Sequence, residues 1–100
     1  MSHGILIQYR YSGDEAAWKA ATGAFIDAID ADSDVAGRFS YSVNVLADGE
    51  GRVHVGRWDG EDTLKTLQSR DYFKTFAGKV QEFGGDTVVA SRFANSVETG

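Results

Sequence analysis

A chain of 100 residues is long enough for one compact domain and too short for two. Its 15 acidic residues outnumber its 10 basic ones, and the net charge of −5 argues against nucleic acids and anionic membrane surfaces as partners. The absence of cysteine excludes a thiolate nucleophile, a disulfide framework and a cysteine-ligated zinc site. No apolar stretch approaches the roughly 18 residues of a membrane span, and the N-terminus lacks a signal-peptide pattern. We therefore expect a single cytoplasmic domain over residues 1–100.

The first third of the chain predicts a strand followed by a helix. Apolar and polar side chains alternate over residues 4–12, as in a strand with one apolar face. Ser12 and Glu15 have the spacing of a capping box, so the helix is expected to begin there. Apolar residues then recur every three or four positions and form one stripe: Trp18, Ala21, Phe25, Ala28 and Ile29. Because carboxylates oppose the dipole at a helix C-terminus, the helix should end near Asp30 or Ala31.

Three aspartates follow with the spacing of a calcium-binding loop: Asp30, Asp32 and Asp34. Such a loop needs glycine at its sixth position and glutamate at its twelfth, where this chain has Val35 and Tyr41. The segment is therefore interpreted as a solvated acidic loop, and no metal site is predicted.

The middle of the chain predicts a β-hairpin. Alternation over residues 39–45 and again from Val53 flanks a turn that contains two glycines. Gly56 interrupts the second strand just before Trp58, which indicates either a bulge or a close backbone approach. A bulge would reverse the face on which Trp58 lies, so the sequence leaves that orientation open.

The last third predicts a broken helical region and a final strand. One stripe contains Phe73, Phe76, Val80 and Phe83, whereas Leu64 and Leu67 lie off it. Because one straight helix cannot bury both sets, we predict a short helix near 61–67 and a longer one near 70–83, with Ser69 as the N-cap of the second. Gly84 and Gly85 should end that helix. The last strand is expected over 87–93, followed by a tail over 95–100.

The resulting order of strand, helix, strand, strand, helix and strand predicts an α+β fold of the ferredoxin-like βαββαβ class, an antiparallel sheet with two helices on one face. Strict alternation would turn Val53 and Val55 toward the helices. The opposite face would then carry a mixed set with few charges: Leu6, Gln8, Arg10, Ser40, Ser42, Asn44, His54 and, without a bulge, Trp58. Such a mixture is more typical of a partly enclosed cavity than of a freely solvated face.

Trp58, the segment 63–73 and the later apolar stripe of the second helical region together resemble the dimeric α+β barrel superfamily, and within it the antibiotic-biosynthesis-monooxygenase-like proteins. The resemblance spans nearly the whole chain and implies a homodimer in which two subunits pack their bare sheet faces together. Members often carry a histidine three residues before the serine of the broken helix, where this chain has Thr66, and no histidine follows His54. Haem degradation is therefore not expected, and neither is any cofactor.

The resemblance implies oxygenation of a small aromatic or enolisable substrate without metal or flavin. That chemistry requires a base, donors that stabilise the resulting anion and an apolar wall. His54 is the candidate base, with Arg10 and Asn44 as further catalytic candidates. Trp58, Gln8 and Tyr72 are the candidate substrate-binding residues.

Each of these residues also has a purely structural interpretation. His54 could be a surface or interface residue, Trp58 a packing anchor at a dimer interface, and Arg10 the partner of a carboxylate across the subunit boundary. The alternative function is therefore a non-catalytic dimer that binds a small molecule or only buries its sheet face. RNA-recognition modules share this element order, but strand 51–58 lacks their paired exposed aromatics and the net charge is negative, so no nucleic-acid partner is expected.

Overall fold

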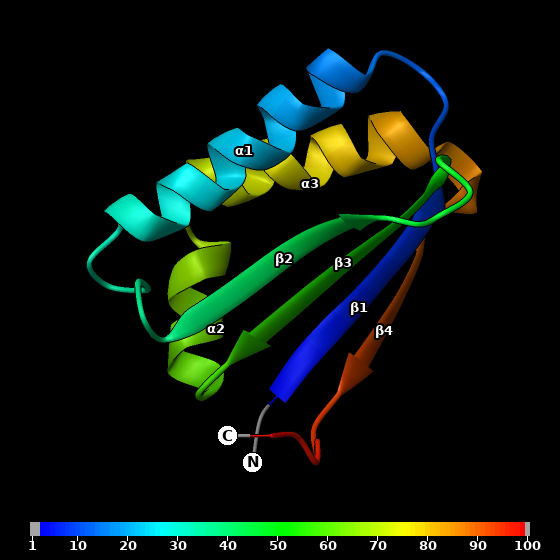
Figure 1. Ribbon diagram of the computed structural model, residues 1–100. Helices are drawn as coiled ribbons and strands as arrows, with labels where there is room; N and C mark the ends of the chain where they lie inside the picture. Colours follow the sequence, from blue (N-terminus) through cyan, green and yellow to red (C-terminus); the bar gives the residue numbers. More distant parts are fainter. Residues whose placement is uncertain (1–2, 100) are drawn as a thin grey trace.

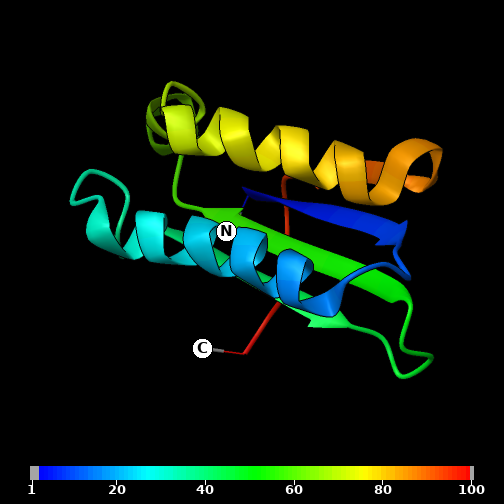
Figure 2. The same cartoon turned by 90° about the horizontal axis from the view of Figure 1, so that it is seen from above.

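The computed structural model describes residues 3–99 and confirms the ferredoxin-like α+β class (Figure 1). Strand β1 (His3–Arg10) is followed by helix α1 (Glu15–Ala31), strands β2 (Phe39–Val45) and β3 (Gly51–Trp58), helices α2 (Glu61–Gln68) and α3 (Asp71–Gly84), a 3-10 turn η1 (Gly85–Thr87) and strand β4 (Val89–Phe93). The four strands pair antiparallel in the order β2-β3-β1-β4. Helices α1 and α3 run side by side over one face of the sheet, and no described helix covers the other, which we call the uncovered face (Figure 2). The C-terminal tail crosses one end of this face, where Glu98 pairs with Arg57 at 3.0 Å. No helix within residues 3–99 is long and apolar enough to cross a membrane.

Helix α1 begins at Glu15, but its N-cap is a different residue from the one predicted. Asp14, not Ser12, is the N-cap, and its carboxylate accepts hydrogen bonds from the backbone N–H groups of Ala16 and Ala17 at 2.9 and 3.4 Å. Aspartate serves this position as well as serine does, because its oxygen reaches the same free amides and its charge favours the positive end of the helix. The helix ends at Ala31, as predicted.

The break in the second helical region is confirmed. Leu64 and Leu67 are buried on α2, while Phe76 and Val80 are buried on α3, so the two apolar stripes pack through two separate helices. Ser69 does not cap α3; it closes α2 instead, where its hydroxyl donates to the carbonyl of Thr66 at 2.6 Å.

Strand β3 has the opposite orientation to the predicted one. Its register runs without interruption through Gly56, so no bulge is present, and opposite residues on neighbouring strands share a face. His54 lies opposite Ile7 and Val43, and Trp58 lies opposite Phe39; all of these face the helices. Val53 and Val55 therefore lie on the uncovered face. The alternative interpretation of Gly56, a close approach, holds: a Cβ there would lie 3.0 Å from the ring of Tyr41.

Two glycines of helix α3 provide a matched test of the packing. A Cβ on Gly84 would lie 2.5 Å from Val88 and 2.7 Å from the Cβ of Tyr9, so Gly84→Ala forces the helix end away from β1. We expect a loss of about 1–3 kcal/mol in the free energy of unfolding. Gly78 has no neighbour within 4 Å, and Gly78→Ala should raise stability by up to about 1 kcal/mol. Urea denaturation measures both; equal effects of the two substitutions would contradict the close approach.

Candidate functional site

A pocket of about 200 Å³ lies between the sheet and helices α2 and α3. Strand side chains such as Ile7 and Ala90 form its floor, and Leu67, Phe73 and Phe76 close it from the helices. Most of the lining is apolar, so a ligand there would be shielded from water. A cavity of about 150 Å³ is large enough for benzene, so this one accommodates a molecule built on one aromatic ring.

Trp58 and Arg92 are two of the residues with polar groups that line the pocket. Trp58 is 4% exposed and stacks on Phe39 with centroids 5.7 Å apart, yet its indole Nε1 is buried without a hydrogen-bond partner among the described residues. The guanidinium of Arg92 lies 5.0 Å from the centre of the Trp58 ring and also lines the pocket. The Arg92 side chain is half-exposed, and it pairs with Glu61 at 3.9 Å at the rim. Because an indole N–H can only donate, this arrangement suits a ligand that carries an oxygen acceptor or an anion.

His54 lies behind the pocket wall rather than on the uncovered face. Its Nε2 is 2.8 Å from the hydroxyl of Tyr9, and its Nδ1 is 2.8 Å from the hydroxyl of Tyr41. Trp18 donates its indole N–H to the same Tyr9 oxygen at 2.8 Å. Of these side chains, Tyr41 lines the pocket. The alternation in the sequence predicted that Tyr41 faces the helices. It did not predict a role for Tyr41 in the site, because nothing in the pattern indicated which polar group it would contact.

Burial keeps this network neutral. His54 is fully buried, and desolvation lowers its pKa from 6.5 to about 4. Desolvation likewise raises the pKa values of Tyr41 and Tyr9, whose charged forms are anionic. At pH 7 all three side chains are therefore uncharged hydrogen-bonding groups.

Arg10, Asn44 and Gln8 lie on the uncovered face, across the sheet from His54 and Trp58. Arg10 is paired with Asp48 at 3.2 Å and Glu50 at 3.5 Å, and Asn44 donates to the carbonyl of Val53 at 3.1 Å. Arg10 thus pairs with carboxylates of its own chain, whereas the alternative interpretation placed its partner across the subunit boundary. The six candidate residues do not form one site in the single subunit.

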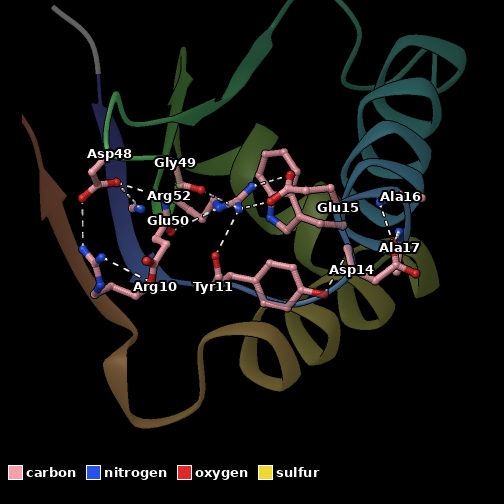
Figure 3. A network of polar contacts seen from close by, with 12 residues as sticks. Arg10, Tyr11, Asp14, Glu15, Ala16, Ala17, Asp48, Gly49, Glu50 and Arg52 are labelled. Atoms are coloured by element: carbon pink, nitrogen blue, oxygen red, sulfur yellow. Dashed lines mark hydrogen bonds and ion pairs between the residues drawn. The ribbon is translucent and has the colours of Figure 1, made fainter.

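Arg52 is a second arginine near the turn between β2 and β3, and its environment differs from that of Arg10 (Figure 3). It is 1% exposed, donates to Glu15 and to the carbonyl of Tyr11, and lies 4.5 Å from the centre of the Trp18 ring. A buried cation of this kind is stable only with such partners. Arg52 therefore ties β3 to the start of α1, beside the network that contains His54.

Tyr72 lies outside the pocket. Its hydroxyl donates to Asp32 at 2.8 Å, and its pKa is raised to about 12 by burial and by that carboxylate. Arg70 binds both Asp32, at 2.9 Å, and Asp34, at 2.7 Å. The acidic loop is thus held by a neighbouring arginine at the junction of α2 and α3. The Tyr72 ring lines a separate outer groove between α1 and α3.

Comparison with known proteins supports the fold. No family model and no curated protein matches the sequence. Among solved structures, Rv0793 from Mycobacterium tuberculosis is similar over the full length of both chains, with a TM-score of 0.78 and 19% identity. SnoaB, a cofactor-independent oxygenase from Streptomyces nogalater, is similar over 97% of this chain and 95% of its own, with a TM-score of 0.77 and 11% identity.

A third solved structure is a dimeric ferredoxin-like protein of unknown function from Jannaschia, similar over 95% of this chain and all of its own, with a TM-score of 0.72 and 11% identity. Other similar structures carry the provisional name of antibiotic biosynthesis monooxygenase. The fold implied by the resemblance is therefore confirmed: the chain has a ferredoxin-like fold similar to that of solved structures with this provisional name.

Proposed function

We propose that the chain binds a small, planar phenol or enol in the pocket between the sheet and helices α2 and α3, and oxygenates it with dioxygen without a cofactor. The observation that carries this proposal is the buried, unpartnered indole N–H of Trp58 beside Arg92 in an otherwise apolar pocket. A donor and a cation at one end of an apolar cavity favour a phenolate or enolate over a neutral hydrocarbon. The similarity to a cofactor-independent oxygenase supports the same chemistry.

The residues of the chain would act by binding and stabilising the anion. An acidic phenol gives its hydroxyl proton to water before it binds, which makes the ring electron-rich, and a ring carbon can then react with dioxygen. One oxygen atom enters the product as a carbonyl and the other leaves in water, so a phenol and dioxygen give a quinone and water. The apolar walls formed by Leu67, Phe73 and Phe76 would keep water from the intermediate.

We further propose that the working protein is a homodimer formed through the uncovered sheet face. This face carries a central group of apolar side chains: Leu6, Val53, Val55, Val89 and Phe93. Val89 is 58% exposed in the single chain. Because an exposed group of apolar side chains is unfavourable in water, pairing with a second copy would stabilise it. The dimeric state of a similar solved structure supports this arrangement.

Oxygen uptake with a panel of phenols and quinols tests the activity. The wild-type protein should consume dioxygen and form the quinone, and Trp58→Phe, which keeps a ring but removes the N–H, should lower kcat/KM about tenfold or more. Lys74→Ala, an exposed change on α3 outside the pocket, is the matched control. Uptake that is equal in the wild-type and Trp58→Phe proteins would contradict the assigned site.

The alternative is a binding module without catalysis. The neutral Tyr9–His54–Tyr41 network favours it, since burial lowers the pKa of His54 and leaves no strong base at the pocket. Saturable binding of phenols with no oxygen uptake would support this alternative and contradict the oxygenase.

A further inference from the structure

Four side chains form a continuous, mostly buried chain of hydrogen bonds that runs from helix α1 across the sheet to the pocket. Trp18 begins it on α1, Tyr9 follows on β1 and His54 on β3, and Tyr41 on β2 ends it at the pocket wall. Each donor–acceptor distance is 2.8 Å. Trp18, Tyr9 and His54 are at most 3% exposed, so water contributes little to satisfying them.

The direction of each hydrogen bond follows from the first donor. The indole of Trp18 can only donate, so the Tyr9 oxygen accepts from it. If His54 Nε2 also donated to that oxygen, the hydroxyl proton of Tyr9 would have no partner among the described residues. A buried donor left without a partner is costly, so Tyr9 donates to Nε2. In a neutral imidazole the other nitrogen, Nδ1, then carries the proton and donates to the Tyr41 oxygen.

We propose that this chain of hydrogen bonds leaves the hydroxyl proton of Tyr41 free to be donated to the substrate's oxygen in the pocket. The inference rests on the proposed function and makes it more specific: the ligand is bound by two neutral donors, Tyr41 and Trp58. Tyr41 is then the residue that contacts substrate. His54 is a positioning residue: its Nδ1–H donates a hydrogen bond to the Tyr41 oxygen, and Tyr9 fixes the tautomer of His54.

This assignment differs from a role for His54 as general base. Accepting a proton through Tyr41 would require a free lone pair on Nδ1, and that nitrogen already carries a proton in the tautomer that Tyr9 selects. The substrate would therefore be bound as an anion already formed, or as a neutral phenol whose oxygen accepts from Tyr41. Acidic phenols are accordingly the preferred substrate class.

Nitrogen NMR of the protein without ligand tests the tautomer directly. We expect the Nδ1 of His54 to be protonated and its Nε2 to be unprotonated, with the signals assigned by their loss in His54→Gln. A protonated Nε2 would overturn the proposal whether or not the protein is an oxygenase. In Tyr9→Phe, which changes no residue of the pocket lining, the single Nδ1–H form should no longer be selected.

Binding of two matched probes tests the donor role. Para-nitrophenol and nitrobenzene have the same ring and nitro group, and only the former has the hydroxyl oxygen. Tyr41→Phe should weaken the binding of para-nitrophenol about tenfold and change the affinity for nitrobenzene by less than about twofold. Tyr11→Phe removes a hydroxyl that bonds the carbonyl of Asp14, away from the pocket, and should change neither.

The outcomes separate the two proposals. Equal weakening of both probes by Tyr41→Phe would assign Tyr41 to packing and overturn the donor role. Unchanged para-nitrophenol binding in Tyr9→Phe, despite an altered His54 tautomer, would overturn the positioning role of the network. If neither probe binds the wild-type protein, the pocket assignment of the proposed function fails and the donor role with it, while the NMR result still decides the direction of the hydrogen bonds.

Discussion

Replacing Val55 by aspartate is expected to convert the proposed dimer into a monomer of 10.8 kDa. Val55 lies at the middle of the uncovered face, opposite Leu6 on one neighbouring strand and Ser42 on the other. A carboxylate there stays in water in the single chain, but in a dimer it would be buried beside its own copy without a partner. The cost of burying two such charges is larger than the association energy of a small interface.

Sedimentation velocity measures the change. Val45→Asp makes the same chemical substitution at a half-exposed side chain on the helix-facing side of β2, opposite Arg52, and should leave the proposed dimer intact. Circular dichroism of the Val55→Asp protein should retain the α+β spectrum, because the substituted side chain does not enter the core. A wild-type protein that sediments as a monomer, or a Val55→Asp protein that remains a dimer, would contradict assembly through this face.

Acidification should destabilise the fold by about 3 kcal/mol between pH 7 and pH 4 through His54 alone. Burial lowers the pKa of this side chain from 6.5 to about 4. Between pH 6.5 and about pH 4, His54 is therefore protonated in the unfolded chain but not in the folded chain. The free energy of unfolding falls as the pH is lowered through this window. A difference of 2.5 pKa units corresponds to about 3 kcal/mol.

Urea denaturation at a series of pH values measures this dependence. Carboxylates whose pKa values are lowered by their partners, such as Asp48 and Asp59, lose their stabilising contribution only as the pH falls below about 4, outside the window of His54. His54→Gln should flatten the curve between pH 6.5 and pH 4 and leave the loss at lower pH. An unchanged slope in that variant would contradict the neutral, buried state of His54.

Much of the fold could be predicted from spacing alone, because its elements have clear periods. The misalignment of Leu64 and Leu67 with the stripe of Phe76 and Val80 is a geometric consequence of the helical repeat, and it located the break between α2 and α3 correctly. The cap of α1 was predicted two residues too early, since serine and aspartate serve equally well at that position and both occur there.

The orientation of β3 could not be predicted from its own residues. Val53 and Val55 are apolar, so alternation assigned them to the core and His54 to the opposite face, whereas the structure does the reverse. Two facts outside the strand account for this: Tyr9 and Tyr41 satisfy a buried His54, and Glu15 satisfies a buried Arg52. When both faces of a sheet are at least partly apolar, period alone does not distinguish inside from outside.

This reversal also explains why only part of the candidate site was found. Trp58 does line a pocket, and His54 lies behind its wall, but Arg10, Asn44 and Gln8 were grouped with them through the wrong face. Arg92 had no recognisable signal, because a single arginine in a short final strand is typical of a solvated residue. Its position over the Trp58 ring becomes visible only when β4 is paired with β1.

The central claim, that the pocket beside Trp58 binds a phenol, is tested most directly by the two indole N–H signals of the protein in a nitrogen–proton NMR titration with para-nitrophenol. The chain has two tryptophans, and they provide an internal control: Trp18 donates to Tyr9 behind the wall, whereas Trp58 has no partner among the described residues. We expect the Trp58 signal to move saturably and the Trp18 signal to move far less. Binding that leaves the Trp58 signal in place would contradict the account.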